Sequence, residues 1–282
     1  MGFKELTEEH IKYLTDTINL NEGVLKKESQ EKLGSYFNVH PRTIRKWVKK
    51  LGLNRKRKSI SRVISDDKKN ILVIGDLHEP FCLDEYLSFC KQQYEEFGCN
   101  EVIFIGDIID NHYSSYHETD ADGLGGKDEL EFATKRIQGW YKTFPVATVI
   151  IGNHDRIIMR KAQTSSIPSA WIRDYKEVLK VPNWVFVDRK VIGDIQFIHG
   201  EAGKAESKSK SDLMSTVQGH YHTEAYVKWF VGANYKIFGA QTGCGVDHDS
   251  YAMAYAKRGK KPAIGCLVII NEEIPINLMM EL

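Results

Sequence analysis

The chain has 282 residues, of which 42% are hydrophobic and 27% charged, the usual balance of a globular protein. This composition excludes collagen-like, disordered and disulfide-scaffold proteins. No apolar run approaches the ~18–20 residues of a membrane span, and the charged start MGFKELTEEH lacks the apolar core of a secretion signal. The five cysteines are odd in number and widely spread, as in reduced thiols. We therefore expect a cytoplasmic protein with no membrane partner.

The net charge of +1 is the sum of two segments of opposite charge. Residues 1–62 carry fifteen basic and seven acidic side chains, a net charge of +8, and the remaining residues carry 24 basic and 31 acidic ones, a net charge of −7. A basic arm on an acidic body suggests two separate tasks. We expect domains at 1–58 and 70–282, joined by a polar linker at 59–69.

Apolar spacing in the basic arm predicts two short helices. Leu33 and Phe37 are four residues apart, and the apolar residues from Ile44 to Leu51 follow a second helical pattern. Asn38 tolerates the left-handed backbone of a tight turn, and Pro41 suits the first turn of the next helix.

The segment Gln30–Lys49 resembles the helix-turn-helix of DNA-binding proteins, although Asn38 stands where that family usually has glycine. The resemblance implies an all-α domain whose second helix enters the major groove. Residues expected to face DNA are His40, Arg42, Thr43, Arg45, Lys46 and Lys49. The alternative is a helical hairpin with a solvated basic face, but the basic cluster Arg55–Lys58 favours DNA. Such a domain often works as a dimer, so a homo-oligomer is a further expectation.

From residue 70 onward, short β-rich runs alternate with helical stretches, which indicates a layered α/β domain. Expected strands are Ile71–Ile74, Val102–Ile105, Thr148–Ile151, Ile195–Ile198, a run ending near Val217, Lys236–Phe238 and Cys266–Ile270. Expected helices are Leu83–Phe97 and Glu129–Thr143. The polar run 201–212 is expected to be a mobile loop.

Polar motifs follow five of these strands, each with a glycine: GDLH at 75–78, GDIID at 106–110, GNHD at 152–155, HG at 199–200 and GHYH at 219–222. Ligands of α/β sheets gather at the carboxyl ends of strands, so the motifs point to one site. Aspartate, histidine and asparagine without cysteine suit manganese, iron, zinc or similar divalent ions. The number of candidate ligands favours two metals that share a bridging carboxylate.

This ordered set of motifs resembles the calcineurin-like metallophosphoesterase superfamily over residues 70–245. The resemblance implies a four-layer α/β/β/α sandwich with a dinuclear centre, for which manganese is the leading metal and iron, zinc, nickel, cobalt and magnesium are alternatives. It implies that one metal is held by Asp76, His78 and His222, that the other is held by Asn153, His199 and His220, and that Asp107 bridges them. It also implies that His154 is the catalytic histidine, oriented by Asp110, beside a metal-bridging hydroxide that attacks phosphorus.

The substrate is less well specified. Protein Ser/Thr phosphatases of the superfamily have Asp-Arg-Gly where this chain has Asp110-Asn111-His112, which argues against that branch. Arg156, His112 and Tyr113 lie near the motifs and are candidate substrate contacts. Arg156 is as readily explained by a structural ion pair, and His112 and Tyr113 by packing of their loop onto the body.

The basic arm favours a DNA phosphodiesterase, a nuclease or nickase, similar to the small metallophosphoesterases of phages and prophages in a bacterial or phage-infected cell. The alternatives are a phosphatase or nucleotide phosphodiesterase on small molecules, with the arm used for localisation or assembly, and an inactive DNA-binding scaffold. The complete set of ligand-type residues argues against the inactive scaffold.

Overall fold

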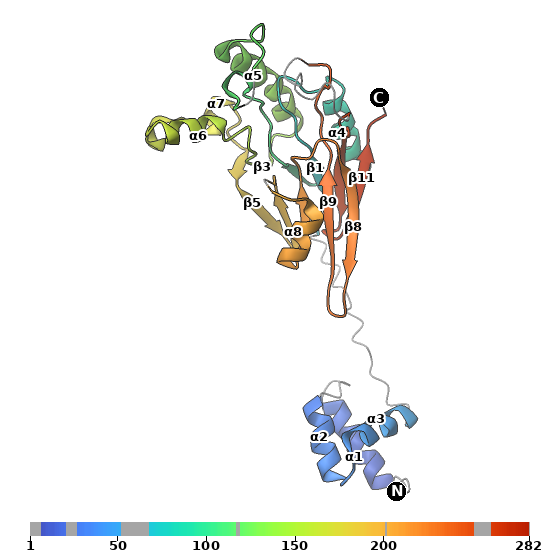
Figure 1. Cartoon of the computed structure of the whole chain (residues 1–282). Coiled ribbons are helices and arrows are strands. Elements are labelled where there is room, and N and C mark those ends of the chain that lie inside the picture. The colour runs from blue at the N-terminus through green and yellow to red at the C-terminus, as the bar shows by residue number, and fades with distance from the viewer. Residues whose placement is uncertain are drawn as a thin grey trace. The chain divides into compact units, whose positions relative to one another are not determined.

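The computed structural model describes residues 7–20, 27–51, 68–116, 119–200, 202–250 and 261–281. The chain divides into two compact units, Met1–Asp67 and Lys68–Leu282 (Figure 1). The basic cluster at 55–58 and the expected linker up to residue 67 lie outside the described residues.

The described residues of the smaller unit form three helices, namely α1 (Glu8–Leu20), α2 (Lys27–Tyr36) and α3 (Pro41–Lys50). Helix α1 was not predicted from the sequence. Its Leu14 is fully buried and joins a core made of the apolar residues on which the prediction of α2 and α3 rested. The buried members of this core are Leu14, Leu33, Phe37, Ile44 and Trp47.

The connection between α2 and α3 is tight. Asn38 adopts the left-handed backbone, with φ of 51°. Gly34 leaves no room for a side chain, because a Cβ there would lie 2.9 Å from the Val39 carbonyl oxygen. Pro41 begins α3, and the His40 imidazole caps this helix by accepting a hydrogen bond from the Arg42 N–H at 3.1 Å.

The larger unit contains two β-sheets. The six-stranded sheet has the order β11-β10-β1-β2-β3-β4. Strands β1 to β4 are parallel, and β10 and β11 add an antiparallel edge. The strand bounds are Ile71–Ile74 (β1), Glu101–Phe104 (β2), Thr148–Ile150 (β3), Val185–Val187 (β4), Gly265–Ile270 (β10) and Ile274–Met279 (β11).

The five-stranded sheet has the order β5-β6-β7-β9-β8. Within it, β6, β7 and β9 run parallel, while β5 and β8 pair antiparallel with their neighbours. The bounds are Arg189–Ile192 (β5), Ile195–Ile198 (β6), Ser215–Gln218 (β7), Ala225–Val231 (β8) and Lys236–Thr242 (β9).

Side chains that alternate along β1 show how the layers stack. Ile71 and Val73 join a core between the two sheets, whereas Leu72 and Ile74 face a second core with helices α4 (Tyr86–Glu96) and α5 (Gly126–Thr143). All four side chains are fully buried, so this strand is covered on both faces. Together with a helix on the outer face of the other sheet, the expected four-layer α/β/β/α sandwich is confirmed (Figure 1).

That outer helix corrects the sequence analysis. Residues 201–212 were expected to form a mobile loop, but Ala205–Asp212 is helix α8. The helix buries only the small side chains of Ala205 and Ser209, and a Cβ on Gly239 of β9 would lie 2.7 Å from the Glu206 backbone. Close backbone approach and an ion pair between Glu206 and Lys228 at 2.5 Å hold it in place, so it needs no apolar stripe.

The remaining elements are short, namely α6 (Ile157–Thr164), α7 (Tyr175–Val178) and 3-10 turns at His112–Ser114 and Ser169–Trp171. Each expected strand coincides with an observed one, while β4, β5, β8 and β11 were not anticipated. All five cysteines are buried and free of disulfides. Among the described residues, no helix has the length and apolar character to span a membrane.

Candidate metal centre

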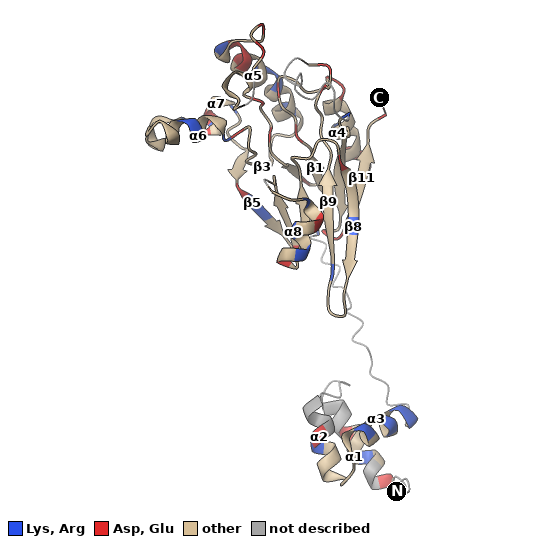
Figure 2. Ribbon diagram, viewed as in Figure 1, with Lys and Arg blue, Asp and Glu red and all other residues tan. Residues whose placement is uncertain are grey.

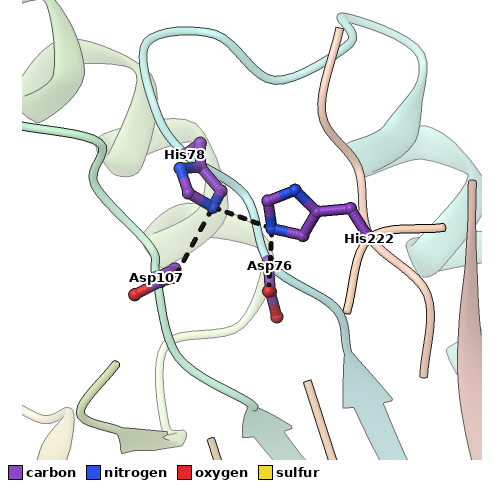
Figure 3. A group of neighbouring side chains, drawn as sticks. All are labelled: Asp76, His78, Asp107 and His222. Atoms are coloured by element: carbon purple, nitrogen blue, oxygen red, sulfur yellow. Dashed lines mark hydrogen bonds and ion pairs between the residues drawn. The ribbon is translucent and has the colours of Figure 1, made fainter. Parts of the chain in front are cut away.

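The five polar motifs converge at the carboxyl ends of β1, β2, β3, β6 and β7. The structure brings together side chains that are as far apart in sequence as Asp76 and His222, whose Oδ2 and Nε2 atoms are 3.1 Å apart (Figure 3). Three groups of ligand-type side chains form there, and each has its ligand atoms within 4.8 Å of one another. Two of them share Asp107 and are described first, and the third consists of His78, Asp110 and His154.

The first group consists of Asp76, His78, Asp107 and His222 (Figure 3). His78 Nε2 lies 3.1 Å from His222 Nε2 and 3.6 Å from Asp107 Oδ2. The three residues Asp76, His78 and Asp107 are buried, with at most 1% of their surface exposed.

The second group consists of Asp107, His199 and His220. His199 Nε2 lies 3.1 Å from Asp107 Oδ2. Asn153 belongs with them, because its Oδ1 is 2.9 Å from His199 Nε2 and 2.9 Å from His220 Nδ1. Asp107 is therefore the member that both groups share, through the same carboxylate oxygen.

Two features test whether a cation fits here. Asp76 Oδ1 is buried, and among the described residues it has no hydrogen-bond partner. His78 and His222 point ring nitrogens at each other at 3.1 Å, although one proton at most can lie between them. Buried acceptor atoms normally find a partner. A divalent cation between these atoms would supply it, so the residues fit a metal.

Hydrogen bonds from the Nδ1 atoms orient two of the histidines, His199 and His78. His199 Nδ1–H donates to the Ile105 carbonyl oxygen at 3.0 Å, which leaves Nε2 as its acceptor atom. His78 Nδ1–H donates to Asp110 Oδ1 at 2.5 Å, with the same consequence. Such partners select the tautomer that binds a metal and strengthen the ligand.

His154 lies beside the first group, with its ring centroid 4.5 Å from that of His78. Its Nδ1–H donates to the Asp110 carbonyl oxygen at 2.7 Å, and Asp110 Oδ1 is 3.2 Å away. Burial disfavours the charged imidazole, but the hydrogen bond to Asp110 and the charges of Asp107 and Asp110 outweigh it and raise the pKa of His154 to about 10. Asp110 thus contacts the imidazoles of His78 and His154, where the resemblance implied only the second, and its Oδ2 also lies 3.8 Å from His112 Nδ1.

Burial also opposes ionisation of Asp110. Hydrogen bonds from His154 and His78 outweigh burial and hold the pKa of Asp110 well below its ordinary value. The carboxylate therefore stays charged and fixes both rings.

Asp155 ends the GNHD motif and received no role from sequence. Its carboxylate is 1% exposed and accepts four backbone hydrogen bonds, two on each oxygen. Oδ2 accepts from Asp107 and Gly152 at 2.9 and 2.8 Å, and Oδ1 accepts from Ile108 and Ile109 at 3.1 and 3.4 Å. This side chain ties the loop after β2 to the loop after β3 and so positions Asp107 opposite Asn153. A buried acid inside a ligand motif was the signal that could have identified it.

The backbone of the site is unusual. His78, Asp107 and His220 have φ of 51°, 48° and 72°, a left-handed conformation that side chains other than glycine rarely adopt. Gly152 and Gly219 each press directly on a carboxylate, that of Asp107 and Asp76 respectively, so neither position accepts a side chain. Strain of this kind persists where the surrounding fold imposes it, as at functional sites.

The loop after Asp110 is built around Glu129 of α5. The Glu129 carboxylate is 1% exposed and accepts hydrogen bonds from the N–H groups of His112 at 2.8 Å and Tyr113 at 3.2 Å. The His112 ring is 6% exposed and its Nε2 accepts from the Asp120 N–H at 3.0 Å. Tyr113 packs against Gly126 at the start of α5. Both candidate substrate residues therefore hold the loop together.

Arg156 donates to Asp188 Oδ1 at 2.9 Å, the ion pair that the sequence analysis kept as an alternative. Arg156 also lines a cavity of about 480 Å³ together with Asn153, Arg160 and His220. The site thus opens beside the second ligand group onto a surface that carries two arginines.

The residues expected to face DNA lie on α3 in the smaller unit. His40, Arg42, Arg45, Lys46 and Lys49 are exposed, and Thr43 is half-buried. Ile44 and Trp47 form the buried face, so the exposed basic side chains lie on the outer face of the helix. Figure 2 shows how many positions of α3 are Lys or Arg.

A family model and several solved structures are similar to this chain. The family model described as calcineurin-like phosphoesterase matches residues 69–258. Solved structures similar to the chain include a single-mutant Vps29 from Entamoeba histolytica (13% identity, TM-score 0.37, covering 75% of this chain and 99% of that one). Vps29 from Cryptosporidium parvum has 15% identity and a TM-score of 0.36, covering 76% of this chain and 98% of that one. YfcE, a phosphoesterase from E. coli, has 12% identity and a TM-score of 0.35, covering 75% of this chain and 100% of that one. No curated protein matches the chain significantly.

The family match spans well over half of the chain and contains every residue of both ligand groups. The protein therefore belongs to the calcineurin-like phosphoesterase family and is a metal-dependent phosphoesterase, a hydrolase of phosphoric esters.

Proposed function

We propose that the protein is a two-metal phosphodiesterase that hydrolyses DNA, as a nuclease or nickase. The observation that carries the proposal is the placement of Asp107 Oδ2, 3.6 Å from His78 Nε2 on one side and 3.1 Å from His199 Nε2 on the other. One carboxylate oxygen facing two sets of ligand-type atoms is the arrangement that a bridging ligand requires.

In this proposal Asp76, His78 and His222 hold one metal and Asn153, His199 and His220 hold the other. Nitrogen and oxygen donors without thiolate suit manganese first, with iron, zinc, nickel, cobalt or magnesium as alternatives. When bound, two divalent ions would supply Lewis-acid polarisation of the phosphate and acidify water at the site.

The protein's own contribution is to place and hold a proton. His154 Nδ1–H is committed to the Asp110 carbonyl, so a charged His154 presents its second proton at Nε2, where a leaving alkoxide can accept it. We expect His154→Ala to lower turnover about 10²–10⁴-fold, the usual contribution of a general acid. Metal content measured by plasma spectrometry should stay near the wild-type value, because His154 is not among the residues proposed here to hold either metal. Near-normal activity would refute this role.

The choice of DNA rests on the smaller unit, which we propose to be a helix-turn-helix domain. Its α3 presents exposed basic side chains beside a buried apolar core, and they include Arg42, Arg45, Lys46 and Lys49. Binding of the full chain to a duplex should weaken with salt, and R45Q/K49Q should reduce the log–log slope by about 2 if both residues contact phosphate. K12Q/K32Q, which removes two exposed charges from α1 and α2, is the charge-matched control. A slope unchanged in R45Q/K49Q would refute the DNA interface.

One comparison separates DNA from small-molecule substrates. The purified chain with Mn²⁺ is given supercoiled plasmid, single-stranded DNA, a chromogenic phosphodiester and a chromogenic phosphomonoester, in parallel with Asp107→Asn. We expect nicking of plasmid and turnover of the diester, both lost in the variant. Monoester turnover without DNA cleavage would instead indicate a small-molecule phosphatase that uses the smaller unit for localisation or assembly.

The setting of this function is also a proposal. The five buried free cysteines fit a reducing compartment, so we propose the cytoplasm of a bacterial or phage-infected cell. Paired basic units in a homo-oligomer would suit a DNA site with two-fold symmetry.

A further inference from the structure

Helix α6 begins directly after the GNHD motif and carries basic side chains toward the site. Arg156 precedes the helix, and Arg160 and Lys161 lie one turn further on. Arg156 and Arg160 are four residues apart and therefore neighbours on one face.

These two arginines share one cavity with the second ligand group. The cavity of about 480 Å³ is lined by Asn153, His220, Arg156 and Arg160. A metal held by Asn153 and His220 would thus open onto a space whose other wall carries two guanidinium groups. Guanidinium groups recognise phosphate through paired hydrogen bonds, and they keep their charge at every physiological pH.

Tyr116, in the loop after Asp110, contacts the basic side chains of α6. The Arg160 guanidinium carbon lies 5.0 Å from the centre of the Tyr116 ring, and Lys161 Nζ lies 5.4 Å from it. These contacts fix the orientation of Arg160, while 55% of Tyr116 remains exposed. An exposed aromatic ring beside arginines is the usual platform for an unpaired base.

We propose that Arg160, with Arg156, forms a subsite for the phosphate next to the scissile one in a nucleic-acid strand, and that Tyr116 stacks on the intervening base. This inference rests on the proposed function and names its preferred substrate as a polynucleotide rather than a single-phosphate ester. Asp188, which pairs with Arg156, is 78% exposed and is free to move aside into solvent when phosphate arrives.

The test compares two substrates with the same scissile bond, the 5′-p-nitrophenyl phosphodiesters of thymidine and of trithymidylate. The full-length wild-type enzyme should prefer the longer ester. Arg160→Gln should reduce the ratio of kcat/KM values, longer over shorter, about tenfold, as expected for one charge-assisted hydrogen bond of about 1.5 kcal/mol. Arg160→Lys should keep part of the preference because it keeps the charge. Lys135→Gln, an exposed charge loss on α5, should leave the ratio unchanged.

A binding measurement in EDTA decides the inference without turnover. Fluorescein-labelled trithymidylate should bind the Arg160→Gln chain about tenfold more weakly than the wild type. Equal binding together with an unchanged kcat/KM ratio would overturn the subsite. Tighter Arg160-dependent binding of thymidine triphosphate than of trithymidylate would overturn the assignment to a nucleic-acid strand. If neither ester is hydrolysed by the wild type, the proposed function fails, and the binding measurement still decides the subsite.

Discussion

The Asp155 carboxylate offers the sharpest test of how the site is held together. Asp155→Asn keeps the size of the side chain but replaces one oxygen with an NH₂ group. The remaining oxygen can accept the two shorter hydrogen bonds, from Asp107 and Gly152, and the NH₂ group then faces the N–H groups of Ile108 and Ile109. One hydrogen bond of 3.1 Å and one weak bond of 3.4 Å are lost, and donors are left opposed to donors.

The cost follows from burial. A buried donor without a partner costs about 1–3 kcal/mol. Burial and the charge of Asp107 raise the pKa of Asp155 to about 7, so the comparison is made at pH 8, where the side chain is charged and a hydrogen bond to it contributes about 1.5–3 kcal/mol. We expect Asp155→Asn to lower the free energy of unfolding by about 2–4 kcal/mol, which for a unit of this size lowers Tm by about 4–16 °C. Urea and thermal unfolding of the metal-free protein measure this, with Asp194→Asn in the exposed turn between β5 and β6 as the matched control. A loss below about 1 kcal/mol would refute the positioning role.

Two further predictions concern other buried groups. Ile44 is fully buried in the small helical unit, so Ile44→Ala should lower the free energy of unfolding of that unit by about 2–4 kcal/mol. The variant should lose DNA binding and keep phosphodiester turnover. Circular dichroism and binding assays measure this, with Ser35→Ala at an exposed position as the control. Burial raises the pKa of Glu129 to about 7, against the hydrogen bonds from His112 and Tyr113. A carboxyl group whose pKa is higher in the folded than in the unfolded state contributes its full stabilisation below the unfolded-state pKa. That stabilisation is lost as the pH rises through the folded-state pKa of about 7, so the urea midpoint in EDTA should fall between pH 5 and pH 8. In Glu129→Gln that fall should be smaller, and an identical pH slope in the two proteins would contradict the assignment.

The candidate site could be anticipated from sequence because each ligand-type residue directly follows a short apolar strand. Strand ends such as that of β1 are local signals, since the apolar run Ile71–Ile74 stops at the glycine before Asp76. Parallel pairing of β1, β2 and β3 then carries the motifs to one edge of the sheet. Neither step needs knowledge of distant contacts.

What escaped prediction depends on distant contacts. Helix α8 looks like a solvated loop because the surface that covers it, Gly239 of β9, lies more than twenty residues away in sequence. Strand β8 has a largely exposed face, so its sequence AYVKWFV lacks the uninterrupted apolar run seen in β1. Arg160 gained significance only when the fold placed it on the same cavity as Asn153 and His220. In each case the residue type is common, and its role is set by a neighbour that is distant in sequence.

The metal site explains part of the negative charge of the larger unit. The larger unit, residues 68–282, carries 24 basic and 29 acidic side chains, a net charge of −5, and three of its acidic side chains, Asp76, Asp107 and Asp110, are buried at the site. Burying several carboxylates is costly unless cations or hydrogen bonds compensate them. Two divalent ions would compensate the first two, and His78 and His154 compensate the third. The same ions would turn the local field positive, in line with Arg156 and Arg160, so an acidic body can present a phosphate-attracting face where the chemistry takes place.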